Sequence, residues 1–225
     1  MTEANDNSKG WLVRPVEWAL RRGFTRAYYT IRVNPDDYLM QLRSAHGLPV
    51  QSYEGLAAQP VETLDEIAIE TVRASRKLAA IGGAGFGLGG LLTMVPDLGV
   101  LAAITMRTIQ KLSLIYGFQY NTDEERADLW VAAATAAGVD ISRELLEKTV
   151  LKSFIQKVIQ RIAAQASAEA AEKTLARAVP LVSSVLGAGI NYYFVNAWGM
   201  RAMAHFREKH IAMRENQKTL PESKI

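Results

Sequence analysis

Apolar side chains recur at helical spacing along almost the whole chain. In the region after residue 61, apolar and small positions follow a period of three to four residues through Leu64, Ile67 and Val72. No segment of useful length alternates between apolar and polar residues as a half-buried strand does. No linker rich in proline, glycine or serine divides the chain. The pattern therefore predicts an all-α protein with a single helical domain.

The two ends of the chain differ from its middle. Residues 1–32 combine a polar tail with a basic amphipathic arm, and the helical domain is expected over residues 33–213. Residues 214–225 are polar, and we expect them to form a flexible C-terminal tail.

Several short motifs mark where helices begin and end. Asn34 is a helix cap, Pro35 suits the first helical position, and Gly47 is placed to end that helix. Thr122 followed by Glu125 matches a capping box and predicts the start of another helix.

The stretch from Ala79 to Met106 holds six glycines within nine residues, Gly82 to Gly90. A phosphate-binding loop needs a preceding strand or a closing Lys-Ser/Thr, and neither is present. A membrane-spanning hairpin would bury the nearby charges of Arg107 and Lys111. Burial in a packed bundle and shallow insertion into lipid both remain open for this segment.

Close packing of helices is the simplest explanation of these glycines. Gly83 and Gly87 are four residues apart, and Gly187 and Gly189 form a second small-residue row late in the chain. Such rows let another helix backbone approach closely. We therefore expect a domain built around two glycine-rich helical hairpins, the first turning at residues 94–97 because of Pro96.

The N-terminal arm is amphipathic and basic. Its apolar residues include Val16, Leu20 and Phe24 on one helical face, and its arginines lie largely away from that face. Tryptophans add interfacial character. The residues expected to contact a membrane are Trp11, Arg14, Trp18, Arg21, Arg22, Phe24 and Arg26. The alternative is that the arm docks on its own domain. Nucleic-acid binding is less well supported, because the basic residues of the arm are not accompanied by a nucleic-acid recognition motif.

Composition and charge narrow the chemistry. The chain has no cysteine, which excludes disulfides and thiolate metal sites and fits a reducing compartment. Its polar N-terminus has no signal-peptide core, so we expect a cytoplasmic protein. His205 and His210 are five residues apart, which does not suit a metal pair, and we expect surface histidines. No catalytic motif is present, and we expect no cofactor, no metal and no classical catalytic machinery.

The residues from Ala79 to Gly117 resemble the hallmark of the EcsC family of bacterial proteins. The matching positions are Pro96, Asp97, Arg107, Ile109, Tyr116 and Gly117, and later Glu125, Arg126, Pro180, Gly187, Gly189, Asn191 and Phe206. Ser183-Ser184 departs from the more glycine-rich turn expected there. The resemblance spans roughly residues 61–207. It implies a bacterial, intracellular protein associated with the inner face of the membrane, and it supplies no agreed biochemical activity.

Two functions follow as expectations. The first is a peripheral membrane or partner-binding protein, with an anionic membrane surface or, by family analogy, a membrane protein such as an ABC transporter as its partner. The second is a lipid- or small-molecule-binding enzyme with a polar pocket formed by Asp97, Arg107, Gln110 and Asn191. The alternative for Asp97 is a first-turn acid stabilised by the helix dipole, and for Asn191 a buried hydrogen bond that sets helix register.

Overall fold

The computed structural model describes the backbone of residues 3–30, 32–84, 91–141, 150–175 and 183–219. Within these ranges the chain forms eight helices and no strand, which confirms the all-α class. The helices are α1 (Glu3–Thr30), α2 (Pro35–His46), α3 (Tyr53–Ala57), α4 (Val61–Ala84), α5 (Leu91–Ile115), α6 (Asp123–Ala136), α8 (Leu151–Leu175) and α9 (Ser183–Thr219).

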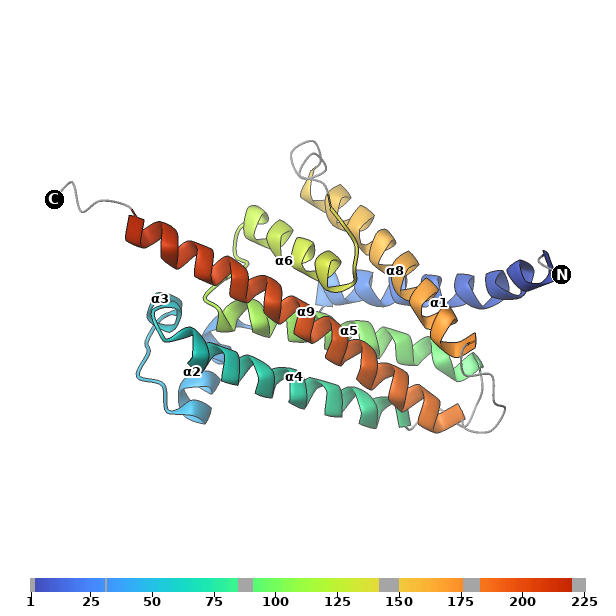
Figure 1. Ribbon diagram of the computed structural model, residues 1–225, viewed down its shortest axis with the longest axis horizontal. Coiled ribbons are helices and arrows are strands. Elements are labelled where there is room, and N and C mark those ends of the chain that lie inside the picture. Colours follow the sequence, from blue (N-terminus) through green and yellow to red (C-terminus); the bar gives the residue numbers. More distant parts are fainter. Residues whose placement is uncertain (1–2, 31, 85–90, 142–149, 176–182, 220–225) are drawn as a thin grey trace.

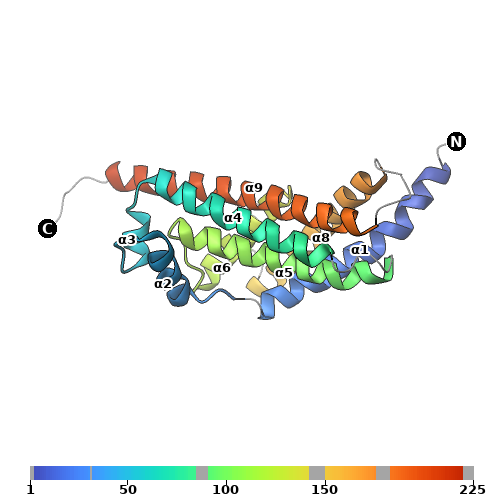
Figure 2. The same cartoon turned by 90° about the horizontal axis from the view of Figure 1, so that it is seen from below.

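The helices form an elongated bundle. α4 and α9 lie side by side along the long axis, and α5 packs against both of them (Figures 1 and 2). α1 packs between α5 and α8, while α6 packs against α8 and α9. The short helices α2 and α3 lie at one end of the bundle, and α1 begins near the other end (Figure 1).

The predicted helix caps are confirmed. The side-chain oxygen of Asn34 accepts a hydrogen bond from the backbone N–H of Asp36 at 3.0 Å, and Gly47 ends the helix with a left-handed φ of 61°. Thr122 and Glu125 form the predicted capping box at the start of α6. These local motifs explain why the helices begin and end where the sequence indicates.

The predicted turn at residues 94–97 is wrong. α5 begins at Leu91 and continues through Pro96, so residues 94–97 are helical, while residues 85–90 between α4 and α5 lie outside the described part of the chain. Proline lacks one backbone donor and disfavours helix at the residue before it, so α5 continues through Pro96 against a local preference. Asp97 is accordingly the seventh residue of α5 rather than a first-turn acid.

Helix α9 extends to Thr219, six residues beyond the expected end of the helical domain at Met213. No glycine or proline interrupts this segment before Pro221. The guanidinium Nη1 of Arg214 donates a hydrogen bond to the backbone carbonyl of Gln59 at 2.8 Å. Part of the tail that we expected to be flexible is therefore helical and tied to the residues before α4.

Close packing through glycine occurs at a position that we did not predict. A Cβ atom added to Gly199 in α9 would lie 3.0 Å from both γ-carbons of Val72 in α4, so the absence of a side chain lets these two helices approach. Of the predicted positions, Gly87 lies outside the described residues. Gly83 lies in the last turn of α4, and Gly187 and Gly189 lie in α9, but the packing around these three glycines is outside the described part of the structure. Close packing at the predicted glycines therefore stays a prediction.

Candidate functional site: the exposed face of α1

The described side chains of α1 separate into a buried face and an exposed face. Ala19, Leu20, Phe24 and Ala27 are buried at spacings of one, four and three residues, and form one helical stripe. This stripe belongs to the main hydrophobic core, against α5 and α8. The apolar face of the arm is therefore docked on its own domain.

Phe24 was expected to insert into a membrane, and its packing contradicts that expectation. Its side chain is 1% exposed, and its ring stacks on that of Trp198 in α9. Burying a phenylalanine in the core is worth about 1.5–3 kcal/mol relative to leaving it exposed, which favours the docked position. The side chain of Trp11 lies outside the described residues.

The opposite face of α1 is exposed and carries the arginines. Arg14, Arg21, Arg22 and Arg26 are all exposed, and Trp18 is 47% exposed among them. The guanidinium carbon of Arg22 lies 5.3 Å from the centroid of the Trp18 ring, a cation–π contact. Residues 14, 18 and 22 are four apart, so they form a single line along the helix surface.

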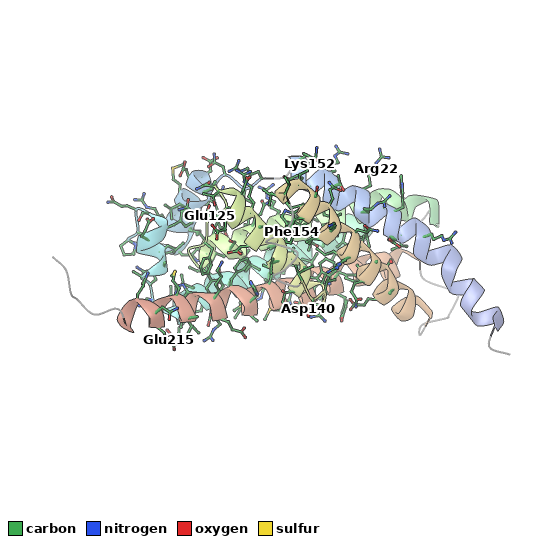
Figure 3. The ribbon with its side chains drawn as sticks, turned by 90° about the horizontal axis from the view of Figure 1, so that it is seen from above. Arg22, Glu125, Asp140, Lys152, Phe154 and Glu215 are labelled. Atoms are coloured by element: carbon green, nitrogen blue, oxygen red, sulfur yellow. The ribbon has the colours of Figure 1, made fainter. Side chains whose placement is uncertain are left out.

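A neighbouring helix contributes a further cation at the same edge of the molecule. α8 packs against α1, and Lys152 in its first turn is exposed. In Figure 3, Lys152 and Arg22 both lie along the upper edge of the view, whereas Glu215 lies at the lower edge. Val150 next to α8 is also exposed, so apolar and cationic side chains are mixed on this surface.

Three of the four residues of the predicted polar pocket have described side chains; that of Asp97 lies outside the described residues, so the pocket stays a prediction. Gln110 is buried, and its side-chain oxygen accepts a hydrogen bond from the backbone N–H of Val33 at 2.9 Å. Arg107 is exposed, while Asn191 is buried in α9. Arg107 follows Asp97 by ten residues of one helix, about 15 Å along its axis, which is too far for a direct ion pair.

Gln110 instead has a structural role. The backbone of Val33 is buried between α1 and α2, and both of its polar groups find side-chain partners. Its N–H donates to Gln110, and its carbonyl accepts a hydrogen bond from the Tyr120 hydroxyl at 2.7 Å. Satisfying both groups avoids the penalty of a buried unpaired backbone.

A polar network that we did not predict joins three helices. Asp65 of α4 accepts a hydrogen bond from the hydroxyl of Tyr116, just after α5, at 2.6 Å, and one from the Nε of Arg207 in α9 at 2.8 Å. His210 is 0% exposed, and its Nδ1 lies 3.0 Å from the backbone carbonyl of Tyr116. The expectation of a surface histidine is therefore wrong for His210.

The electrostatics of this network favour a fixed structural role. Burial, and then the acceptor Asp65, raise the pKa of Tyr116, so its phenol stays protonated and continues to donate. The hydrogen bond to Asp65 likewise raises the pKa of Arg207. Each carboxylate oxygen of Asp65 accepts one of these hydrogen bonds, so the group connects α4 to α9 and to the end of α5.

A surface cavity of about 240 Å³ lies beside Gly117 and is mixed in character. Its lining residues are Glu54, Ser113, Gly117, Phe118, Gln119, Glu125, Asp128, Leu129, Phe206 and Lys209. The ammonium group of Lys209 already has partners inside this cavity. Its Nζ donates a hydrogen bond to Asp128 at 2.6 Å and lies 4.6 Å from the centroid of the Phe118 ring. The cavity contains none of the four residues of the predicted pocket.

The described residues include neither a membrane-spanning helix nor a group of metal ligands. Across the part of the chain that the structure describes, no helix combines the length and apolar character needed to cross a bilayer. Among the same residues, no three carboxylate or imidazole side chains are grouped so as to hold a metal ion. What this fold presents is a helical bundle with a docked N-terminal helix whose outer face is basic.

The chain belongs to the EcsC protein family, whose model matches residues 24–211. The match begins within α1, at the buried Phe24, and so includes the last quarter of the helix that we expected to lie outside the domain. The family resemblance predicted from the glycine-rich segment is confirmed.

Two curated relatives come from Bacillus subtilis (strain 168). The uncharacterized protein YdbA is 24% identical over 176 residues, which cover 73% of this chain and 64% of YdbA. The protein EcsC is 34% identical over 82 residues, covering 36% of this chain and 35% of EcsC. The chain thus matches less than two thirds of the length of either relative. No solved structure matches it significantly.

Proposed function

We propose that this protein binds an anionic membrane surface peripherally, through the exposed face of α1. The observation that carries the proposal is the exposure of Arg14, Arg21, Arg22 and Arg26 around Trp18 on a helix whose other face is docked. Each basic residue near an anionic bilayer contributes about 1 kcal/mol, and tryptophan prefers the bilayer interface. The cytoplasmic face of a membrane, which carries anionic lipids, is the corresponding location.

The docked position of Phe24 determines how this proposal is tested. Deleting residues 1–32 would remove part of the core together with the basic face, so loss of binding after deletion would be uninformative. Point substitutions on the exposed face avoid this problem, because surface changes of this kind alter stability by only about 0.5 kcal/mol.

The test is co-sedimentation with vesicles of phosphatidylcholine, with and without phosphatidylserine. We expect binding only with the anionic lipid, and weaker binding as salt rises, because salt screens exposed charges. Arg21→Glu combined with Arg22→Glu should weaken binding by at least about 2 kcal/mol, roughly thirtyfold. The matched control is Arg43→Glu, an exposed arginine on α2 at the far end of the bundle (Figure 1).

Three results would count against the proposal. Equal binding to neutral and anionic vesicles would show that charge does not drive binding. Equal losses of affinity for the α1 and α2 variants would show that the exposed face of α1 is not the binding surface. Absence of vesicle binding, with recovery in membranes that contain native proteins, would favour a membrane protein as the partner instead.

A further inference from the structure

Large apolar side chains are exposed together at one end of the bundle. Leu78 and Ile81 in the last turns of α4 are 58% and 73% exposed, and Val100 of α5 and Tyr192 and Tyr193 of α9 are also exposed. The end of α4 and the beginnings of α5 and α9 meet at this end (Figures 1 and 2). We call these five residues the apolar end.

Contacts between α4 and α9 hold this arrangement. The Nη1 of Arg76 donates a hydrogen bond to the side-chain oxygen of Asn196 at 2.7 Å. The same guanidinium lies 5.1 Å from the centroid of the Tyr192 ring. These two contacts fix the end of α4 against the first part of α9, so the exposure of their apolar side chains is a property of the folded bundle.

One exposed line of side chains on α4 changes character in order along the helix. Glu66, Glu70, Arg73, Lys77 and Ile81 follow one another at spacings of four, three, four and four residues, and all five are exposed. This spacing places them on one face. Acids therefore come first, bases next, and an apolar residue last, at the apolar end.

The distances along this line match the layers of a bilayer. With a rise of 1.5 Å per residue, Lys77 lies about 6 Å and Arg73 about 12 Å from Ile81 along the axis. An interfacial segment buries its apolar residues by about 5–10 Å, and the headgroup region begins just outside the hydrocarbon core. Glu70 and Glu66 would then lie still farther from the anionic headgroups.

Resting on the membrane binding proposed above, we infer that the apolar end of the bundle enters the outer part of an anionic bilayer, with Arg73 and Lys77 at the level of the lipid phosphates. Leu78, Ile81 and Val100 supply apolar contact with the acyl chains. Tyr192 and Tyr193 take the interfacial level that aromatic side chains with a polar tip prefer. The hydroxyl of Tyr193 donates a hydrogen bond to a carboxylate oxygen of Glu169 at 3.4 Å, so an acid lies beside these aromatic side chains.

An anionic bilayer suits this end better than a second protein copy does. A second copy meeting this end would offer Arg73 and Lys77 no negative partner, because the acids of its α4 line, Glu66 and Glu70, lie still farther from Ile81. Anionic headgroups neutralise the same charges. A surface that is apolar inside and negatively charged at its boundary therefore matches both the apolar residues and the basic residues Arg73 and Lys77.

The absence of cysteine allows a direct measurement of insertion. Ile81→Cys and Glu66→Cys each introduce one thiol on the same face of α4, and each is labelled with an environment-sensitive fluorophore. On phosphatidylserine-containing vesicles, the label at position 81 should shift to the blue and be quenched by lipids that carry a quencher in the acyl chain. The label at position 66 should show neither change.

Affinity gives an independent measurement. Leu78→Gln combined with Ile81→Gln leaves the charge unchanged and should weaken vesicle binding by about tenfold or more, since two exposed apolar side chains lose their burial in lipid. The matched control is Met40→Gln combined with Ile69→Gln, which alters two exposed apolar residues away from this end. The control should bind as the unaltered chain does.

The possible outcomes separate this inference from the proposed function. Vesicle binding that depends on Arg21 and Arg22, with the label at position 81 remaining in water, would overturn the inference and leave the proposed function standing. A blue shift that grows with protein concentration without lipid would replace the bilayer with a second copy. Absence of vesicle binding by the unaltered chain would overturn both.

Discussion

The ring of Phe24 in α1 stacks on the indole of Trp198 in α9, with centroids 5.9 Å apart and planes inclined by 15°. These residues are separated by most of the chain, and both are buried. Their contact joins the basic N-terminal helix to the closing helix of the domain. α1 is thus part of the folded core, and only its outer face is available to a partner.

This contact predicts that α1 stabilises the domain. Phe24→Ala should lower the free energy of unfolding by about 3–5 kcal/mol, because it removes a buried ring and leaves a cavity. Urea denaturation followed by helical circular dichroism would measure this. Trp18→Ala is the control, and should change the value by only about 0.5 kcal/mol, because Trp18 is on the exposed face. Similar effects of both changes would argue against a docked α1.

Gly199 should be sensitive to any increase in size. Gly199→Val places a branched side chain where Val72 already lies 3.0 Å from the added Cβ, and overpacking of this kind destabilises by about 1–3 kcal/mol. Gly99→Ala is the matched control in α5, because its Cβ would meet nothing within 4 Å. It should instead stabilise by up to about 1 kcal/mol through helix propensity. Thermal melts of the two variants should therefore move in opposite directions.

The Asp65 network should contribute more than an exposed ion pair does. Asp65→Ala leaves the hydroxyl of Tyr116 without its acceptor, and a buried unsatisfied donor costs about 1–3 kcal/mol. Asp123→Ala removes the exposed partner of Arg126 and should cost less than about 1 kcal/mol. Chemical denaturation of both variants tests the difference; equal losses would mean that Asp65 acts only as a surface charge.

Alkaline pH should destabilise the protein through its buried tyrosines. Burial raises the pKa of Tyr38 to about 12, and it also raises the pKa of Tyr53, Tyr116 and Tyr120 above the ordinary value of 10. Above pH 10 the unfolded chain therefore binds fewer protons than the folded chain, and the free energy of unfolding falls. For each such tyrosine the slope is about half of 1.4 kcal/mol per pH unit at pH 10, and it approaches about 1.4 kcal/mol per pH unit as the unfolded phenol becomes fully ionised.

Tyr116→Phe isolates one part of that slope. The variant should lose about 1 kcal/mol of the alkaline decline between pH 10 and 11, because the unfolded phenol is about half ionised at pH 10 and almost fully ionised at pH 11. Any change in stability at neutral pH is separate from this loss. Urea denaturation at pH 8, 10 and 11 would measure both quantities. An unchanged slope would show that Tyr116 ionises equally easily in the folded and unfolded chains.

Local chemistry explains what could be predicted of the fold. Helix caps such as Asn34 and the Thr122–Glu125 box act within a single turn, so their residues specify helix starts without knowledge of the rest of the chain. The rule for Pro96 is equally local, and here it failed. The helix continues through Pro96, because a local propensity is only a weak preference that the rest of the fold can override.

The candidate site was predicted only in part, for a related reason. The sequence predicted an apolar and a basic face for residues 14–26, and in the structure Leu20 and Phe24 of the apolar face are buried. Periodicity states which residues share a face, but it does not state whether the apolar face meets lipid or another helix. The contact of Phe24 with Trp198 answers that question, and no local pattern points to it.

The sequence by itself determined the helical class, several helix ends, the two faces of α1 and the order of charges along α4, because each depends on residues within a few turns of one another. The tertiary structure alone decided that Asp65 meets Arg207 and that Gly199 lies against Val72. It also decided that α4 turns Glu66, Arg73 and Ile81 outward. These contacts depend on which helices pack together in the core. The hydrophobic effect that drives this packing is non-directional, so a local sequence pattern does not specify which helix becomes the neighbour of which.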